Sequence, residues 1–440
     1  MSAPTSVRPT PSLRIEELGV QGYRNFKDRV TVPFRAGRRP AEAVSALHGE
    51  SGAGKSNLLS ALAAFFAAAD LCLTSPTGTY DVPPPAPGSP PPLAPITPRD
   101  RFRIDLPTEL DVRFADARLL PLRLTVTPGP ESLRYALTFL PPNDAPPPGH
   151  PFPADKLRPL NDEIRAWLRT WISTPLGPGS RAVARLPARE AASATRLGIP
   201  GPTFPLPPLA EEAYRHRTSL FPESRDLWHR FTLAVRSLPW FENREVSVER
   251  MDRVAELVIE DRGRSVLRFH ELAASEQQAL TLGLFSFFAR APLLIIEYPE
   301  THLDDAMKAA LLTLLQRRID AGRIDQVHLE THETRYDGPT VLRVFRREDG
   351  FSDVVRGPSA GEAPPEIDRK GKESGAKQGW VTREGYTQLP EPMREDMHLT
   401  LGGHVWFLKG KTKWEAWPGQ DLERLFPSED TDDRDPSDPG

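Results

Sequence analysis

Residues 49–56 read Gly-Glu-Ser-Gly-Ala-Gly-Lys-Ser and match the pattern GxxxxGK[ST] at each specified position. The apolar stretch from Val44 to Leu47 precedes them and indicates a strand, and apolar residues from Leu58 to Phe66 follow at helical spacing. A glycine-rich loop between a strand and a helix turns backbone N–H groups toward one point, where they bind a phosphate chain. We therefore expect a phosphate-binding loop here, not an ordinary glycine-rich turn.

The motif predicts which residues of this loop contact a nucleotide and a metal ion. Lys55 would reach the β- and γ-phosphates, and the Ser56 hydroxyl would bind Mg²⁺. The N-terminus of the following helix adds a favourable partial positive charge. The expected ligands are ATP and Mg²⁺. The candidate nucleotide-binding residues in this segment are Gly49, Gly52, Gly54, Lys55, Ser56 and Asn57.

The composition limits the classes of protein that the chain can belong to. Its 440 residues allow roughly two or three domains. The 56 basic and 60 acidic residues nearly balance, which argues against a nucleic-acid-binding surface over the whole molecule but leaves a local basic face open. The single cysteine, Cys72, lies in an apolar helical pattern, so we expect it to be buried and the chain to work in a reducing compartment.

Nothing in the sequence indicates a membrane protein. No apolar run reaches the ~18 residues of a membrane span. The N-terminal residues MSAPTSVRPTPS lack the apolar core of a signal peptide. We expect a cytoplasmic protein without a membrane contact.

Three segments have the composition of connecting or disordered chain. Residues 83–98 are rich in proline, which favours a surface loop over a ligand for a proline-binding module. Residues 358–378 are polar and charged and are expected to be a linker. Residues 428–440 carry six carboxylates and one arginine, which is typical of an acidic disordered tail, and residues 1–12 are also expected to be disordered.

The pattern of apolar residues divides the rest of the chain into parts. Residues 13–155 contain the phosphate-binding loop and several short strand patterns, including two within 13–34 and three within 101–140. Residues 156–245 are expected to form an inserted helical subdomain, with Asn161 as the N-cap of its first helix. Residues 246–357 return to strands and helices, and residues 379–427 form a small aromatic-rich module.

One strand in the range 246–357 has the features of a buried parallel strand. The run Leu293–Ile296 is continuously apolar and ends in Glu297, followed by Tyr-Pro-Glu-Thr-His-Leu-Asp. Helices are expected on either side of it, at 274–289 and 306–319. A further strand, Gln326–Glu330, ends at Thr331 and His332. Because ligands of such sheets bind outside the carboxyl ends of the strands, these residues are candidates for the same site as the loop.

Five motifs in this order resemble the RecF/SMC-type ATPases of the ABC class. They are LxxLxVxGYRNF from Leu13 to Phe26, GESGAGKSNLL from Gly49 to Leu59, ELAASEQQAL from Glu271 to Leu280, IIEYPETHLDD from Ile295 to Asp305, and THE from Thr331 to Glu333. The chain is similar to bacterial AAA-family ATPases of the OLD type, over residues 13–356. It shows no acidic cluster of the TOPRIM nuclease kind.

The resemblance implies an α/β fold, a P-loop NTPase of the RecF/SMC head type. In that family two heads enclose two nucleotides between them, so it also implies a homodimer. His332 would sense the γ-phosphate, and Asp304 would cross the dimer interface. Arg24 and Ser275 correspond to further nucleotide contacts, on the N-terminal turn and in the signature segment.

The chain departs from the family pattern at two places. Where the family has Asp-Glu after the apolar strand, this chain has Glu297 and Tyr298. Glu297 can still hold Mg²⁺, but a phenol with an unperturbed pKa near 10 is a poor general base at neutral pH. Glu300 could substitute as the base only if the loop is rearranged. The signature segment is also altered, since it reads Ala-Ala-Ser-Glu-Gln over residues 273–277.

The module at residues 379–427 contains Trp380, Tyr386, Trp406, Phe407, Trp414 and Trp417. Its aromatic residues indicate either the core of a small β-rich domain or a docking surface for a partner protein. A turn is expected at Gly402-Gly403. His398 and His404 lack the further ligands that a metal site needs.

The sequence leaves three functions open. The first is an ATP-dependent molecular switch that regulates a partner effector, for which the resemblance suggests bacterial antiphage defence. The second is a DNA-binding repair ATPase, which the arginine-containing stretches at 181–196 and 343–347 would permit. The third is a regulatory subunit that binds the nucleotide without hydrolysing it, which Tyr298 favours. ATP binding is thus better supported by the residues than ATP hydrolysis.

Overall fold

A computed structural model describes residues 12–34, 43–82, 95–102, 106–116, 118–129, 132–140, 160–176, 180–188, 206–251, 254–261, 265–333, 340–347, 349–357, 391–397, 405–409 and 414–418. The chain divides into two compact units, Met1–Ala360 and Gly361–Gly440. This division falls inside the range 358–378 that the sequence predicts as a linker. The linker itself, the tail at 428–440 and most of 1–12 and 83–98 lie outside the described residues.

A six-stranded sheet, mostly parallel, forms the centre of the first unit. Its strand order is β15-β14-β3-β13-β12-β8. The strands β14, β3, β13, β12 and β8 are parallel to their neighbours, and β15 pairs antiparallel with β14. The bounds are β3 Val44–His48, β8 Val183–Leu186, β12 Leu293–Glu297, β13 Gln326–Glu330, β14 Thr340–Arg346 and β15 Ser352–Gly357. The strand that precedes the phosphate-binding loop is therefore a central strand.

A second sheet is antiparallel and has the order β2-β1-β5-β6-β7-β4. Its strands show the alternation of buried and partly exposed residues that a sheet with one packed face requires, as in Leu133–Phe139. The bounds are β1 Ile15–Gln21, β2 Val30–Pro33, β4 Thr79–Val82, β5 Thr108–Phe114, β6 Leu122–Pro128 and β7 Leu133–Phe139. The strands expected within 13–34, at 110–114 with 119–126 and at 133–140 are confirmed. The first of the expected runs, Phe102–Leu106, lies mostly outside the described residues.

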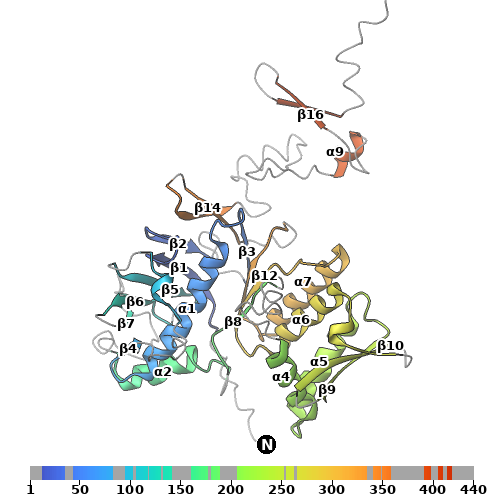
Figure 1. Cartoon of the computed structure of the whole chain (residues 1–440), viewed down its shortest axis with the longest axis horizontal. Helices are drawn as coiled ribbons and strands as arrows, with labels where there is room; N and C mark the ends of the chain where they lie inside the picture. Colours follow the sequence, from blue (N-terminus) through green and yellow to red (C-terminus); the bar gives the residue numbers. More distant parts are fainter. Residues whose placement is uncertain are drawn as a thin grey trace, which may run out of the picture. The chain divides into compact units, whose positions relative to one another are not determined.

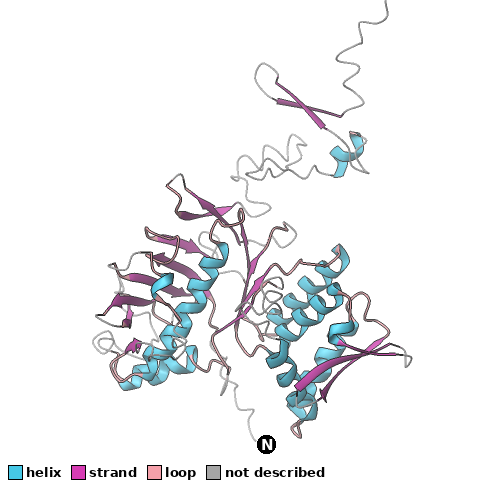
Figure 2. Ribbon diagram, in the orientation of Figure 1, coloured by secondary structure: helices cyan, strands magenta, loops and turns pink. Residues whose placement is uncertain are grey.

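The helix α1 (Lys55–Thr74) lies between the two sheets, as Figures 1 and 2 show. Contrary to the expectation that no apolar run reaches the length of a membrane span, this helix is long and apolar enough to cross one by length and composition alone. However, 67% of its apolar window is buried inside the protein. Its residues Leu58, Leu62 and Phe65 belong to the same core cluster as Leu293 and Ile295 of β12. Cys72 is buried in this core, and burial raises the pKa of its thiol to about 12. Thus α1 is the core helix of a globular α/β unit.

The other face of the parallel sheet is covered by helices. Leu294 and Ile296, which alternate with the residues that face α1, belong to a second core cluster. Four helices and the three-stranded sheet β11-β10-β9 lie on this side (Figure 1). Their bounds are α4 Leu206–Thr218, α5 Pro222–Arg236, α6 Ala274–Phe288, α7 Asp305–Asp320, β9 Arg244–Met251, β10 Val254–Asp261 and β11 Ser265–Arg268. The expected α/β fold, with a P-loop after a strand of the parallel sheet, is confirmed.

The range 156–245, expected to be one helical subdomain, is distributed over the molecule. The helix α2 (Asp162–Ile172) packs in the first core cluster, beside α1, and Asn161 caps it as expected, accepting a hydrogen bond from the Ile164 amide at 2.9 Å. The helices α4 and α5 pack in the second cluster. Between them lies β8, which the sequence did not predict and which pairs with β12. The reason is that β8 is only four residues long and has no strand-like pattern of its own beyond Ala184 and Leu186.

The described part of the second unit holds one short helix and a hairpin. They are α9 (Glu391–Asp396), β16 (Val405–Lys409) and β17 (Trp414–Pro418). The two strands are antiparallel and place Trp406 opposite Trp417. Gly402-Gly403, where a turn was expected, and the two histidines lie outside the described residues.

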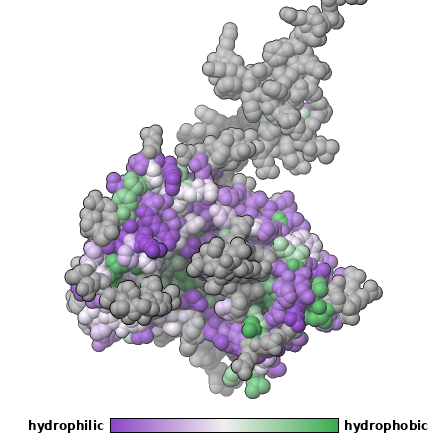
Figure 3. Space-filling model, in the orientation of Figure 1, coloured by the Kyte–Doolittle hydropathy of each residue, from purple (hydrophilic) through white to green (hydrophobic). Residues whose placement is uncertain are grey.

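The visible surface is mainly hydrophilic. On the face shown in Figure 3, apolar residues gather in small groups between hydrophilic ones.

Candidate nucleotide-binding site

The phosphate-binding loop begins directly after β3 and ends at the first residue of α1. Gly49 has a φ of 151°, and a Cβ at this position would collide with the Val344 carbonyl oxygen of β14. Gly54, the N-cap of α1, has a φ of 109°, and a Cβ there would meet the Asn25 side chain. L-residues rarely adopt such angles, so both positions require glycine. The pattern that predicted the loop from the sequence thus reflects its backbone shape.

Lys55 lies inside the loop and is only 3% exposed. Its ammonium donates hydrogen bonds to the carbonyl oxygens of Gly49, at 2.7 Å, and Glu50, at 3.0 Å. Burial lowers the pKa of Lys55, and the nearby carboxylates of Glu330 and Glu300 partly counteract this. The cation is therefore held within the curve of the loop, with two acidic side chains close by. This is the place where a lysine can contact a phosphate chain.

The hydroxyl of Ser56 contacts a carboxylate that the sequence analysis did not select. The Ser56 oxygen lies 2.9 Å from Oε1 and 2.8 Å from Oε2 of Glu330. Glu330 is the last residue of β13, which lies between β3 and β12, and it is 1% exposed. The signal in the sequence was its place at the carboxyl end of a strand, two residues before His332. Nothing in the sequence said that β13 is the neighbour of β3.

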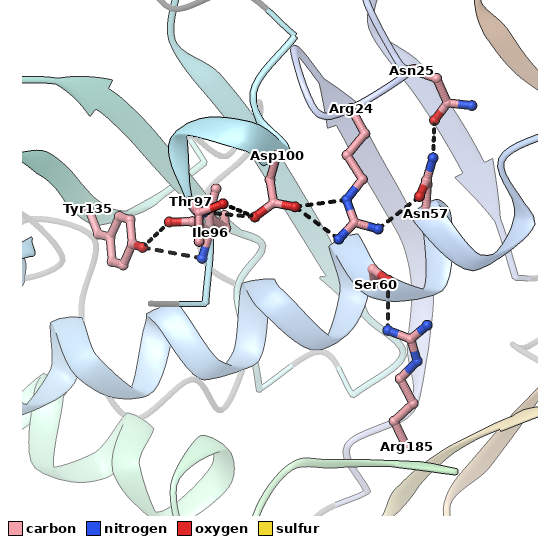
Figure 4. A network of polar contacts seen from close by, with 9 residues as sticks. All are labelled: Arg24, Asn25, Asn57, Ser60, Ile96, Thr97, Asp100, Tyr135 and Arg185. Atoms are coloured by element: carbon pink, nitrogen blue, oxygen red, sulfur yellow. Dashed lines mark hydrogen bonds and ion pairs between the residues drawn. The ribbon is translucent and has the colours of Figure 1, made fainter. Parts of the chain in front are cut away.

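Glu297, the residue expected to bind the metal ion, has other partners. Its Oε1 accepts a hydrogen bond from Arg185 Nε at 2.5 Å, and its Oε2 accepts one from the Ala188 amide at 3.2 Å. Arg185 comes from β8 and also donates to the Ser60 hydroxyl of α1 at 2.7 Å (Figure 4). Glu297 and Glu330 face each other across the β12–β13 register. The two neighbouring carboxylates thus have different hydrogen-bond partners: Arg185 binds Glu297, and Ser56 binds Glu330.

Tyr298 is held against Glu330. Its hydroxyl donates a hydrogen bond to Glu330 Oε1 at 2.7 Å, and its amide donates to the Glu330 carbonyl at 2.7 Å. Burial raises the pKa of the Tyr298 phenol, and the hydrogen bond to Glu330 raises it further. Its φ of 47° is unusual for a residue other than glycine. The phenol therefore stays protonated and acts as a hydrogen-bond donor.

Glu300 and His332 lie together beside this group. The His332 amide donates to Glu300 Oε1 at 2.9 Å, and the His332 ring stacks on Tyr298 with 5.1 Å between centroids. Glu300 Oε2 is buried without a hydrogen-bond partner among the described residues. Buried polar atoms are rarely left without partners, so this oxygen needs a water molecule or a ligand. The tertiary structure thus joins the predicted residues Glu300 and His332 to Lys55 and Ser56.

Arg24 connects the N-terminal turn to the start of α1 through a hydrogen bond to Asn57. It forms an ion pair with Asp100, at 2.9 Å, and donates to the Asn57 side chain at 2.8 Å (Figure 4). Asn57 in turn donates to Asn25 at 2.7 Å. Ser352 completes the contact, because its hydroxyl donates to the Ala53 carbonyl of the loop. Arg24 and Asn57, expected at the nucleotide, therefore hold one another beside the loop.

Asp304 and Ser275 lie at the starts of two helices. Asp304 is the N-cap of α7 and accepts a hydrogen bond from the Met307 amide at 2.8 Å. Ser275 lies in the first turn of α6, where Glu276 bonds back to the Ala273 amide at 2.9 Å. Their predicted roles across a dimer interface stay predictions.

The site contains too few protein ligands to enclose a metal ion by itself. Among the described residues, no group of three or more His, Cys, Asp or Glu side chains could hold one. This fits Mg²⁺, which is usually bound by one or two carboxylates together with substrate phosphates and water. Lys55, Ser56, Glu330 and the unpartnered oxygen of Glu300 supply suitable groups for a magnesium nucleotide.

Comparison with known proteins gives similarity of fold alone. The fold of this chain resembles that of a crystallised SmcHead bound to the C-winged helix domain of ScpA, at 16% identity and a TM-score of 0.46, covering 78% of this chain and 98% of that chain. It also resembles the SMC head domain from Thermotoga maritima, at 15% identity and a TM-score of 0.41, covering 78% and 99%. A third similar structure is the Smc head domain from Pyrococcus furiosus with an extended coiled coil, bound to the C-terminal domain of ScpA, at 15% identity and a TM-score of 0.44, covering 82% and 99%. No family model and no curated protein matches the sequence.

Proposed function

We propose that this protein binds ATP with Mg²⁺ at residues 49–57 and works as an ATP-dependent molecular switch. The observation that carries the proposal is the contact between Ser56 and the buried carboxylate of Glu330, next to a lysine enclosed by its own loop. A hydroxyl and a carboxylate at the carboxyl end of a central strand are the groups that bind Mg²⁺ beside a phosphate chain.

The residues have separate tasks in this proposal. The backbone N–H groups between Gly49 and Ser56 bind the phosphate oxygens, together with the N-terminus of α1. Lys55 contacts the β- and γ-phosphates. Ser56 and Glu330 hold Mg²⁺, which neutralises phosphate charge when it is bound. Glu297, the first candidate from the sequence, then supports the site through Arg185 and Ser60 rather than as the metal ligand.

Hydrolysis of ATP is expected to be slow. Tyr298 stands where a general base would be expected, and its protonated phenol donates to Glu330 instead of accepting a proton. Glu300 is the carboxylate left to orient a water molecule, with His332 beside it. A protein of this kind stays in its ATP-bound state for long periods, which suits a switch. The same geometry also favours another of the functions left open by the sequence, a regulatory subunit that binds the nucleotide without hydrolysing it.

The partners of the switch are also part of the proposal. ATP would join two copies of the chain through the first turns of α6 and α7, which carry Ser275 and Asp304. The second unit, with residues 379–427, would contact a protein effector. Regulation of an effector in antiphage defence is the biological role we propose, in the cytoplasm.

Titration with a fluorescent ATP analogue, with Mg²⁺ and with EDTA, tests the proposal. The native protein should bind it with Mg²⁺, and Lys55→Ala should abolish binding. Glu330→Gln should retain weak binding that no longer responds to Mg²⁺. Glu297→Gln is the matched control, the residue paired with Glu330 in the register of the neighbouring strand, and should keep the Mg²⁺ response. Unchanged binding by Lys55→Ala would overturn the proposal, and loss of the Mg²⁺ response in Glu297→Gln alone would return the metal ligand to β12.

A further inference from the structure

A cavity lies on the helical side of the first unit. Its volume is about 950 Å³, and it is bounded by the C-terminal ends of α4, α6 and α7 and the N-terminal end of α5. Figure 1 shows these helices together on the side of the sheet away from α1. No residue of the phosphate-binding loop lines it. The cavity is therefore separate from the proposed ATP site.

The lining of this cavity is strongly basic. Five arginines face three carboxylates and one histidine, which gives a net charge of two with the histidine neutral. The arginines are Arg215, Arg230, Arg290, Arg318 and Arg323, and the acidic residues are Glu212, Glu223 and Asp226.

Several of these charges neutralise one another. Glu212 lies 3.2 Å from Arg215 and 3.5 Å from Arg290. Asp226 lies 2.7 Å from Arg230. In the part of the chain that the structure describes, neither Arg318 nor Arg323 has an ion pair. Arg318 and Arg323, at the C-terminal end of α7, are thus the lining arginines without an ion pair among the described residues.

Arg318 is held in a fixed position without a carboxylate. Its guanidinium lies 4.1 Å from the centroid of the Phe287 ring, and its Nε donates to the Ser286 carbonyl at 3.3 Å. Burial, together with repulsion from Arg323 and Arg230, lowers the pKa of Arg318 to about 10. Buried charges are normally paired because desolvation of an isolated charge is costly. An arginine that packs on an aromatic ring and lies near two like charges is suited to binding an anion.

We propose that this cavity binds a small phosphate-bearing molecule, with Arg318 and Arg323 as its anion contacts. Guanidinium groups match phosphate oxygens with two parallel hydrogen bonds, and a doubly charged phosphate balances the net charge of the lining. The volume lies at the upper end of the range for small-molecule sites, which favours a metabolite of nucleotide size over a macromolecule. Phe287 and Leu227 supply an apolar wall for the organic part.

Calorimetric titration of Lys55→Ala protein with AMP and with pyrophosphate tests this site, because Lys55→Ala removes the P-loop contribution. At least one probe should bind saturably with one site per chain, while adenosine, which lacks the phosphate, should not bind. Adding Arg318→Gln or Arg323→Gln should weaken binding about tenfold or more, the expected loss for a charge-assisted hydrogen bond. Arg317→Gln is the matched control, an exposed neighbour on α7 that does not line the cavity, and should change nothing.

Three results would overturn the proposal. They are no saturable binding of either phosphate probe, adenosine binding as tightly as AMP, and equal affinity in the Arg323→Gln and Arg317→Gln proteins. Arg323 is exposed, so its replacement tests the site even where Arg318→Gln fails to fold. Binding of a poly-glutamate peptide in place of both probes would assign the cavity to an acidic protein segment instead. Failure here leaves ATP binding at residues 49–57 intact, since the two sites share no residue.

Discussion

The hydroxyl of Ser56 lies 2.9 and 2.8 Å from the two carboxylate oxygens of Glu330, although 274 positions of the sequence separate them. The contact exists because β13 lies between β3 and β12 in the parallel sheet. Glu330 therefore lies beside the first turn of α1, and Glu297 lies one strand further from it. The order of the strands decides which of two buried carboxylates is available to a metal ion.

Replacement of Tyr298 by glutamate is expected to raise the rate of ATP hydrolysis by about tenfold or more, within the range of a general base. The new carboxylate would lie near Glu297, Glu300 and Glu330, which act electrostatically on position 298 in the native protein. Like charges raise the pKa of a carboxyl group toward neutrality, where a base works well. Steady-state phosphate release measures the rate.

Tyr298→Phe is the control for that change. It removes the hydrogen bond to Glu330 without adding a base, so turnover should stay low while stability falls by about 1.5–3 kcal/mol. A contrary outcome is fast turnover of the native protein that is lost in Glu300→Gln but unchanged by either substitution at position 298. It would show that Glu300 is already an efficient base.

Loss of Arg185 is expected to destabilise the protein through Glu297. In the Arg185→Met protein, the carboxylate of Glu297, which is 7% exposed, would keep its hydrogen bond from the Ala188 amide but lose its ion pair. The expected cost is about 1–3 kcal/mol, because the arginine is about one third exposed and water screens part of the interaction. Urea unfolding of Arg185→Met, Glu297→Gln and the double variant measures the coupling. Strictly additive costs would mean that the pair contributes nothing.

Stability is expected to fall in mild acid because of His328. This histidine of β13 is fully buried, binds the Ser45 hydroxyl at 2.7 Å, and has its pKa lowered to about 3 by burial. The unfolded chain takes up a proton near pH 6.5 that the folded protein excludes, so folding becomes less favourable as the pH falls below that value. The expected loss from this residue is about 1.4 kcal/mol between pH 7.5 and pH 5.5.

The comparison with His328→Gln isolates this contribution, because glutamine keeps a hydrogen-bonding group but does not titrate. Urea unfolding at both pH values should show a smaller pH dependence in the variant by that amount. The same pH dependence in the two proteins would mean that other groups, such as carboxylates, account for it.

Removal of the second unit is expected to leave the ATP site intact. The unit Met1–Ala360 contains both six-stranded sheets, the three-stranded sheet, both core clusters and each residue proposed to contact the nucleotide. A protein ending at residue 360 should remain monodisperse in size-exclusion chromatography and bind the ATP analogue with the affinity of the full chain. It should lose its effector in a pull-down. Aggregation, or an affinity reduced about tenfold, would mean that residues 361–440 stabilise the first unit.

The sequence by itself determined the elements whose causes are local. The glycines and Lys55 specify the loop because their backbone angles and spacing belong to one turn. Asn161 specified a helix start because the cap bond reaches only three residues along the chain. The apolar run at 293–296 specified a buried strand, and periodic spacing specified α6 and α7. Each of these signals lies within one element, where a short window of residues contains the whole interaction.

The tertiary structure alone decided which of those elements are neighbours. Because of the strand order, Glu330 lies beside Ser56, and Glu297 accepts a hydrogen bond from Arg185 of the unpredicted strand β8. The same order lets the Tyr298 hydroxyl donate a hydrogen bond to Glu330. It also brought Arg318 and Arg323 to a cavity with α4 and α5. Such pairings join residues that are far apart in the sequence, 32 positions for Tyr298 and Glu330 and 112 positions for Arg185 and Glu297. The pattern along a single strand does not encode which strand will lie beside it.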